Sequence, residues 1–345
     1  FTTAQATILA NGVNDTVLDG GSGVDTLTIS TTAATLTDSH FTKVSNFEKL
    51  VTSTGSTSVS LGTNFSNTFA SGLTYTTGTL ADEKTLTFNG ALYSGDVTLS
   101  SVSAGVGNAA TEDITIVTGA GTDSVTFTAS SFVGATAGAS ISITTNAGDD
   151  TIVLTTGTLV DGSDNQAITI DAGEGKDTIT MTKVNGATAD HFGNALITIA
   201  AGDSLISSYD VITGFDDGAS GAAGDLSDTL DFTGTSAVSD FTQSVDSGVI
   251  KSHSLTTGVA TFDDTDTFDT ALVINSSNLS DVVGYLVANT ANLDTVAFNY
   301  DSTGNGSADS TFVYNNNTVD SLVLLKGHGD ITAVVYSDTA TAAAL

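Results

Sequence analysis

The chain has 345 residues, with seven basic and 39 acidic side chains that give a formal net charge of −32. All seven basic residues are lysines, so the chain lacks the basic footprint that nucleic acids require. It has no cysteine, which excludes disulfide scaffolds and thiolate metal centres, and no apolar run long enough to span a membrane.

The composition favours β-structure. Hydrophobic residues make up 39% of the chain, which has 36 glycines and no proline. Threonine, valine and isoleucine favour strands, whereas glycine, aspartate and asparagine favour turns. Proline would remove a hydrogen bond from any central strand, so its absence suits a chain that is mostly strand. We therefore expect an all-β protein.

The first motif along the chain is Gly20-Gly21-Ser22-Gly23-Val24-Asp25-Thr26-Leu27, which matches the calcium nonapeptide pattern G-G-x-G-x-D-x-U. A weaker copy with Asp15 precedes it. Glycines let such a turn bend with its carbonyl groups inward, and the aspartate supplies charged oxygen. The motif predicts calcium ligands at Asp15, Gly21, Gly23 and Asp25. The alternative is a turn without metal, because aspartate and glycine favour bends by themselves.

Short alternating segments follow this motif. Alternation of apolar and hydroxyl side chains predicts half-buried strands. The predicted strands are Thr26–Ile29, Lys49–Thr52, Ser58–Leu61, Lys84–Phe88 and Asp96–Leu99. The segment His40–Leu50 reads as a corner whose two phenylalanines enter the core.

Three segments then align without gaps, at residues 114–127, 141–154 and 168–181. Their aspartates fall at 123, 150 and 177, which is a repeat of 27 residues. In each copy a strand leads into a Gly-x-Gly-x-Asp turn or a close variant, and a second strand follows. So short a strand pair cannot bury its apolar face alone, but stacked copies can. We expect a right-handed parallel β-solenoid over residues 1–232, with three short faces in each turn rather than two.

Stacking of these turns would bring like charges together. Aspartates in neighbouring turns would lie about 4.8 Å apart and repel by about 0.9 kcal/mol in water, or about 3.5 kcal/mol at an effective dielectric constant near 20. A calcium ion between turns would remove this repulsion, and calcium prefers an all-oxygen shell. The predicted ligands are Gly121, Asp123, Gly148, Asp150, Gly175 and Asp177. Turn chemistry alone is the alternative, with Lys176 as a counter-ion for Asp177.

Two further segments, Asp210–Gly218 and Asp225–Phe232, have the forms D-x-I-x-x-F and D-x-x-D-x-L-D-F. With the nonapeptides and the phrase Val44–Glu48, they make most of the chain resemble the repeats-in-toxin class of type I-secreted proteins. Within that class the chain is most similar to bacterial surface-layer proteins. The resemblance implies calcium ligands at Asp216 and Asp228. It also implies secretion to the cell surface without a cleaved N-terminal signal, by means of an uncleaved C-terminal one such as the tail Thr339–Leu345.

Residues 233–345 predict a small mixed α+β unit. Leu279, Val282, Val283, Leu286 and Val287 have the spacing of an amphipathic helix, for which Asn278 is a suitable N-cap. Strands are predicted at residues 295–300, 310–314 and 321–325.

The loop between the first two of these strands carries oxygen side chains with the spacing of a calcium-binding EF-hand loop. Phe312 at the twelfth position excludes a complete EF-hand. The predicted ligands are Asp301, Thr303, Asn305 and Asp309. The alternative is a long hairpin loop.

No catalytic motif emerges: the four histidines are scattered, and neither an HExxH nor a GxSxG motif is present. We therefore expect a protein that is not an enzyme. The favoured function is a calcium-dependent extracellular structural protein that assembles with copies of itself, bridged by calcium, into a surface layer, sheath or filament. One alternative is a secreted adhesin, or an ice- or glycan-binding solenoid, whose threonine-rich faces contact a ligand such as cell-surface polysaccharide. Another is the remnant of a secreted enzyme. A regular external row of threonines would favour the solenoid that binds ice or glycans.

Overall fold

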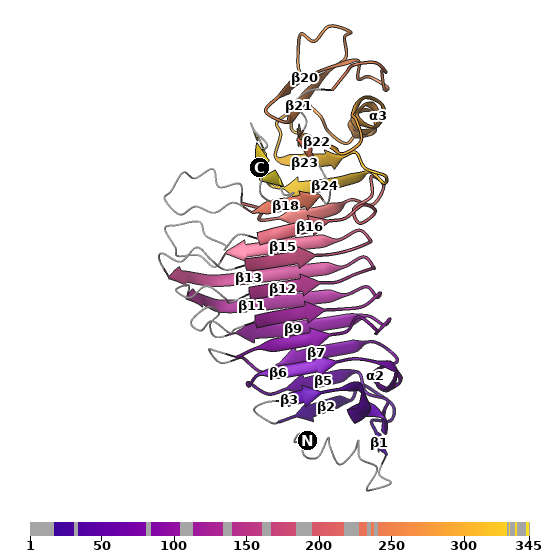
Figure 1. Cartoon of the computed structure of the whole chain (residues 1–345), viewed down its shortest axis with the longest axis vertical. Coiled ribbons are helices and arrows are strands. Elements are labelled where there is room, and N and C mark those ends of the chain that lie inside the picture. The colour runs from indigo at the N-terminus through magenta and orange to yellow at the C-terminus, as the bar shows by residue number, and fades with distance from the viewer. Residues whose placement is uncertain are drawn as a thin grey trace. The chain divides into compact units, whose positions relative to one another are not determined.

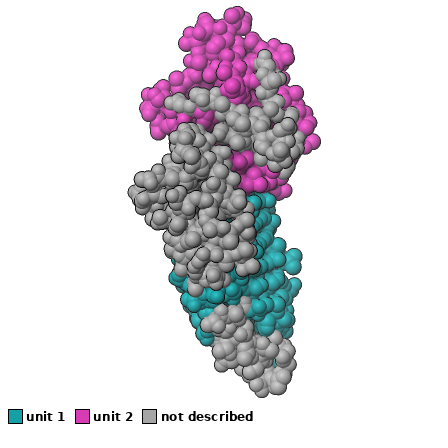
Figure 2. All heavy atoms as spheres, turned by 60° about the vertical axis from the view of Figure 1, so that its left-hand side comes forward, with its two compact units in different colours: residues 1–173, 181–195, 220–226 teal, residues 174–180, 196–219, 227–345 magenta. Residues whose placement is uncertain are grey.

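The chain divides into two compact units in the computed structural model (Figure 2). The first comprises Phe1–Gly173, Met181–Ala195 and Ser220–Leu226, and the second comprises Glu174–Thr180, Leu196–Ala219 and Ser227–Leu345. The structure describes residues 17–30, 34–80, 84–103, 113–133, 140–160, 167–183, 195–216, 228–232, 236–237, 241–329, 331, 335–336 and 343–344. The boundary predicted near residue 233 stays a prediction.

The first unit is a parallel β-solenoid whose strands are stacked in two sheets (Figure 1). The strands of one sheet are, in spatial order, β2 (Thr26–Ile29), β5 (Lys49–Thr52), β7 (Leu73–Thr77), β9 (Val97–Ser103), β11 (Ser124–Val133) and β13 (Thr151–Val160). Those of the other are β3 (Ala34–Leu36), β6 (Thr57–Ser60), β8 (Leu86–Asn89), β10 (Asp113–Val117), β12 (Ser140–Thr144) and β14 (Ala167–Asp171). The chain alternates between the two sheets, so each turn adds one strand to each of them.

Alternating side chains build the core between these sheets. Within each strand, the apolar positions are buried and the hydroxyl positions face outward. Full burial of one aliphatic side chain stabilises the fold by about 1.5–3 kcal/mol, so stacked rows of them supply the driving force. One buried row consists of Leu36, Val59, Phe88, Ile116, Ile143 and Ile170. The facing row consists of Leu27, Leu50, Tyr75, Leu99, Val125 and Ile152.

The early turns add an aromatic cluster at one corner. It involves η1 (Asp38–Phe41) and α2 (Thr63–Thr68), beside the short pair β1 (Leu18–Asp19) and β4 (Val44–Ser45). The ring centroid of Phe65 lies 4.7 Å from that of Phe41 and 4.4 Å from that of Phe69. Phe41 and Phe47 are both buried, as predicted for the corner at residues 40–50.

The turn length varies along the first unit. Ser124 pairs with Thr151, which confirms the repeat of 27 residues for β11 and β13. Upstream, Thr26 pairs with Lys49 and Leu73 pairs with Val97, so those turns take 23 and 24 residues. The sheets keep their register because the differences fall in the segments that connect the strands.

The expectation of three faces is wrong for the part of the solenoid that the structure describes, where the turns form two sheets. The reason is strand length. Strands β11 and β13 each run for ten residues, so a single strand covers the length that was divided between two faces.

The second unit begins with further parallel strands and continues into an antiparallel region. One sheet has the order β15 (Thr178–Lys183), β17 (Asp210–Thr213), β24 (Ser321–Lys326), β23 (Ser310–Asn315), β22 (Asp294–Tyr300), β21 (Val259–Asp263) and β20 (Ser252–Thr256), with β19 (Ser236–Ala237) beside β22. The other has the order β16 (Ala195–Ile199), β18 (Thr229–Phe232), β26 (Ala343–Ala344) and β25 (Val335–Tyr336). Strand β24 pairs in parallel with β17, and β23 and β22 then follow antiparallel to it.

The predicted helix is present as α3 (Leu279–Asn289), with Asn278 at its N-cap position. The Asn278 side chain does not cap the helix but instead accepts a hydrogen bond from the amide of Asn275. Val282, Val283 and Leu286 are buried in the core of this region, as predicted. Val287 remains 46% exposed, because the part of the helix surface that is covered is narrower than the periodicity suggested.

Candidate functional site

The two predicted ligands Asp123 and Asp150 are stacked at one corner of the solenoid. They directly precede β11 and β13, and each is only 1% exposed. The amide N–H of Asp123 donates to Oδ1 of Asp150 at 2.7 Å, and the amide N–H of Val97 donates to Oδ1 of Asp123 at 2.7 Å. Each carboxylate therefore accepts the backbone hydrogen that the preceding turn leaves unpaired at this corner.

The second oxygen of Asp123 has a different environment. Oδ2 of Asp123 is buried and has no hydrogen-bond partner among the described residues. Burial raises the pKa of Asp123, although the hydrogen bond from Val97 opposes this effect. Burial also raises the pKa of Asp150, to about 6. A buried carboxylate oxygen without a donor is a position that a cation can fill, because a charged group in such a place needs a partner.

The predicted glycines allow the turns to approach closely. A Cβ atom at Gly148 would collide with the carbonyl oxygen of Gly121, and one at Gly173 would collide with that of Asn146. Both glycines also have positive φ angles, of 144° and 83°. Close stacking of backbone thus requires glycine here, whether or not a metal is present.

A second pair of stacked aspartates lies in the second unit. The amide N–H of Asp177 donates to Oδ1 of Asp210 at 2.8 Å, and the amide of Asp210 donates to Oγ of Ser204 at 2.7 Å. Oδ2 of Asp210 is buried and has no partner among the described residues, and burial raises the pKa of Asp210 to about 7. Burial and the nearby charge of Glu174 likewise raise the pKa of Asp203.

Asp203 and Asp210 were not among the predicted ligands. Asp210 begins the D-x-I-x-x-F segment, so the sequence did signal it, but as a motif and not as a buried acid. Gly175 was predicted, and its amide donates to the carbonyl oxygen of Asp203 at 3.2 Å.

The nonapeptide turn provides an acidic pair that includes a residue the sequence did not suggest. The amide of Asp25 donates to Oε2 of Glu48 at 2.8 Å, while Oδ2 of Asp25 is buried and has no partner among the described residues. Gly21 and Gly23 have positive φ angles of 89° and 129°, as a tight turn needs. The remaining predicted ligand of this segment, Asp15, lies outside the described residues.

The structure also brings Asp216 and Asp228 together. The amide of Asp216 donates to Oδ2 of Asp228 at 2.9 Å, and the amide of Asp228 donates to the carbonyl oxygen of Asp216 at 2.7 Å. Asp228 is fully buried. The two residues thus form a reciprocal backbone bridge in which one carboxylate takes part.

In the loop predicted to resemble an EF-hand, Asp301 organises the backbone. Its carboxylate accepts the amide hydrogens of Gly304 and Gly306, both at 2.6 Å, and those of Thr303 and Asn305, both at 3.2 Å. Burial pushes the pKa of Asp301 upward, but these amide donors outweigh it and the net shift is downward. The loop can therefore hold its shape through hydrogen bonds alone.

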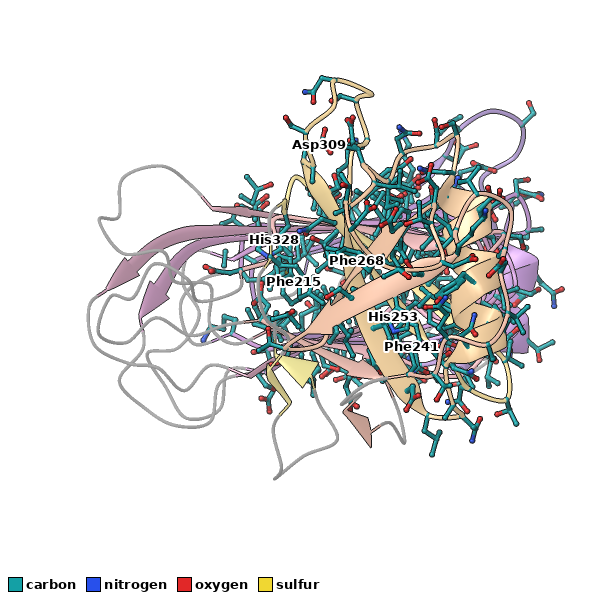
Figure 3. The ribbon with its side chains drawn as sticks, turned by 90° about the horizontal axis from the view of Figure 1, so that it is seen from above. Phe215, Phe241, His253, Phe268, Asp309 and His328 are labelled. Carbon is teal, nitrogen blue, oxygen red and sulfur yellow. The ribbon has the colours of Figure 1, made fainter. Side chains whose placement is uncertain are left out.

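Asp309 closes the same loop and lies on its inner side (Figure 3). Its Oδ1 accepts the amide hydrogen of Ser302 at 3.0 Å and the hydroxyl of Ser310 at 2.9 Å, and these hydrogen bonds lower its pKa. Its Oδ2 is buried and has no partner among the described residues. Of the four predicted ligands in this loop, Asp309 is the one with an oxygen left for a cation.

Taken together, the acidic residues occur in pairs. Within the described part of the chain, no three histidine, aspartate or glutamate side chains converge on one metal position. A cation at any of these pairs would need backbone carbonyl or water oxygens to complete its shell, which calcium accepts readily.

The described histidines of the second unit contribute to aromatic packing. His253 is stacked on Phe241 with ring centroids 3.8 Å apart, and its Nδ1 lies 2.9 Å from the hydroxyl of Tyr285. Figure 3 shows His253 beside Phe241, and His328 beside Phe215.

No protein-family model matches the sequence, and no similar curated protein or solved structure was found. Among the residues described, no helix has both the length and the apolar character needed to cross a bilayer.

Proposed function

We propose that the chain is a calcium-dependent extracellular structural protein of the repeats-in-toxin type, most like a surface-layer protein, which assembles with copies of itself. The observation that carries the proposal is the buried pair Asp123 and Asp150, in which one oxygen of Asp123 has no donor among the described residues. The chain offers almost only oxygen ligands and has a net charge of −32.

The physical argument is electrostatic. Stacked carboxylates at the strand spacing repel by about 0.9–3.5 kcal/mol per pair, depending on the effective dielectric constant. The chain has only seven basic residues to set against 39 acidic ones. Bound calcium would supply the missing positive charge and would stabilise the folded chain by about 4 kcal/mol at a thousandfold excess over its Kd.

Assembly is supported by the sheet edges. Within the described part of the chain, β2 and β3 each pair on one side only. Unpaired edges are templates for another chain, and a head-to-tail contact of this kind propagates. Acidic copies would repel each other, so calcium would also have to bridge between them.

The test combines folding and assembly in one titration. Far-UV circular dichroism and thermal melting of the full chain are followed in EGTA, in calcium and in magnesium, and the same samples are imaged by negative-stain microscopy. We expect folding and ordered arrays in calcium, and much weaker effects in magnesium, which demands a tight octahedral shell. An unchanged β signal and melting temperature in EGTA would contradict the calcium dependence. Folded monomers alone at millimolar calcium would contradict assembly.

A matched pair of variants links the response to the stacked aspartates. Asp150→Asn keeps the oxygen that accepts the Asp123 amide but removes the charge, whereas Asp149→Asn changes an exposed neighbour. We expect the calcium-induced rise in melting temperature to be clearly smaller in Asp150→Asn and unchanged in Asp149→Asn.

A second candidate function, a solenoid that binds glycans or ice, is favoured by an unbroken row of hydroxyl groups. The row runs along the outer face of one sheet, with its members paired in register. It consists of Thr35, Ser58, Thr87, Thr115, Ser142 and Thr169. Thr115→Tyr should then abolish binding to polysaccharide or to ice. Ser100→Tyr, on the opposite face where Val51 and Val153 interrupt the hydroxyls, serves as the control. Wild-type protein that binds neither ligand would exclude this function.

A further inference from the structure

We propose that the middle turns of the first unit, residues 57–103, fold without a cation, and that the cation controls only the turns on either side of them. The proposal rests on the calcium dependence proposed above and says where along the chain it acts. It follows from the residues aligned at the corner where Asp123 and Asp150 are stacked.

These aligned residues, which we call the corner column, come from successive turns of one sheet. Extending the strand register by one residue gives the column Asp25, Glu48, Leu73, Val97, Asp123 and Asp150. Acidic side chains thus occupy both ends of the column, but its two middle positions are apolar. Leu73 is 2% exposed and Val97 is fully buried.

The middle positions also close their backbone hydrogen bonds without a carboxylate. The amide of Leu73 donates to the backbone carbonyl oxygen of Asp96 at 2.8 Å. By contrast, the amides of Asp25 and Asp123 donate to the side chains of Glu48 and Asp150. The corner at Leu73 therefore carries no buried charge.

A shift of one residue explains how the turn at Asp96 avoids the column. Asp96 directly precedes β9, as Asp123 directly precedes β11, but the register pairs Thr98 with Ser124. Val97, and not Asp96, therefore lies opposite Asp123. Asp96 is exposed, and its Oδ1 accepts the amide hydrogen of Thr122 at 2.9 Å. A shift of one residue in a strand moves a side chain to the other face, and here it moves the charge to solvent.

The middle turns have their own source of stability. Tyr75 and Phe88, from opposite sheets, are stacked with ring centroids 5.2 Å apart. Phe65 and Tyr93 meet edge to face at 6.0 Å. Aromatic pairs contribute beyond the area they bury, so this segment combines an uncharged corner with the densest aromatic packing of the first unit. The turns with Asp123 and Asp150 are filled mainly by aliphatic side chains.

The experiment is hydrogen exchange of the full chain, read by mass spectrometry in calcium chloride and in EGTA. Exchange reports the opening of each segment separately. We expect peptides from β7 and β9 to keep their protection in EGTA within about twofold, while peptides from β2, β11 and β13 lose about tenfold or more. Equal loss across all five strands would overturn this proposal but leave the calcium dependence intact. No change anywhere would overturn both.

Two variants test the cause. Val97→Asp restores an acid to the middle of the column, so β7 and β9 should then lose protection in EGTA and recover it in calcium. Replacing both Asp123 and Asp150 by asparagine should do the opposite and raise the protection of β11 in EGTA by about tenfold. Asp96→Asn is the control, because this acid lies outside the column. An equal response to Asp96→Asn and to the double variant would contradict the role of the column.

Discussion

The amide N–H of Asp123 donates to Oδ1 of Asp150 across 2.7 Å, although the two residues are 27 positions apart. This contact gives the Asp150 carboxylate two opposing effects on the fold. It satisfies a buried backbone donor, and it sets one buried negative charge beside another. Substitutions can separate these effects, because alanine removes both of them and asparagine removes only the charge.

Asp150→Ala should destabilise the protein in calcium by about 1–3 kcal/mol, because the Asp123 amide loses its acceptor. Asp149→Ala changes an exposed side chain and should stay within about 0.5 kcal/mol of wild type. Urea unfolding at saturating calcium measures both, and calorimetry should give a weaker calcium affinity for Asp150→Ala alone. Equal losses would mean that the two neighbours do not differ in role.

In EGTA the protein should become more stable as the pH falls from about 8 to about 5. Burial raises the folded-state pKa of Asp150 to about 6 and of Asp210 to about 7, so the folded chain binds protons that the unfolded chain does not. Stability is therefore gained as the pH falls through these values and is complete near the unfolded pKa of about 4. Below that, Asp301 and Asp309, whose pKa values are lowered, lose their contribution.

The measurement for this prediction is the melting temperature as a function of pH. Asp210→Asn keeps an acceptor for the Asp177 amide but cannot titrate, so its melting temperature should depend less on pH than that of wild type. General repulsion among the surface acids affects both proteins alike. Parallel curves would show that the buried aspartates do not cause the dependence.

Gly173→Ala should cost about 1–3 kcal/mol more than Gly202→Ala. Both glycines have positive φ angles, of 83° and 101°, so the backbone strain is similar. A Cβ at Gly173 would meet the carbonyl oxygen of Asn146, whereas one at Gly202 has nothing within 4 Å. Thermal unfolding of the two variants isolates the cost of the close approach, and equal costs would contradict it.

Asp301→Ala should open the loop at residues 302–308 even when calcium is present, because four amide hydrogens lose their common acceptor. Limited proteolysis should then cut this loop faster by about tenfold or more, while β22 and β23 remain paired. Ser307→Ala is the control, since the Ser307 amide, not its hydroxyl, bonds to Asn305. Unchanged cleavage of Asp301→Ala would show that other contacts hold the loop.

The repeat and its strands could be predicted because their causes are local. Alternation around Ile141 and Ile143 requires a half-buried strand, and the glycine-aspartate turn before Thr151 requires a bend, so the register of β12 and β13 followed from the sequence. The same reasoning located β22, β23 and β24 within one or two residues.

The corner column could not be predicted in the same way. Glu48 differs in residue type from the repeated aspartates, and Leu73 and Val97 have no acid to mark their place. Their alignment depends on how many residues each connecting segment uses, which varies from turn to turn. The strand β7 was missed, as was the helix α2, because no repeat signals either element.

The equal length of the turns at Ser124 and Thr151 has an evolutionary consequence. These two strands pair residue for residue along nearly their whole length, so residues 124–150 carry their own set of inward and outward side chains. Duplication or loss of the 27 codons that encode them would lengthen or shorten the stack by one turn. Such a change would leave the next strand facing the same neighbours as before. Genes of this kind can therefore change the reach of their product by recombination within the repeat, without new mutations in the core.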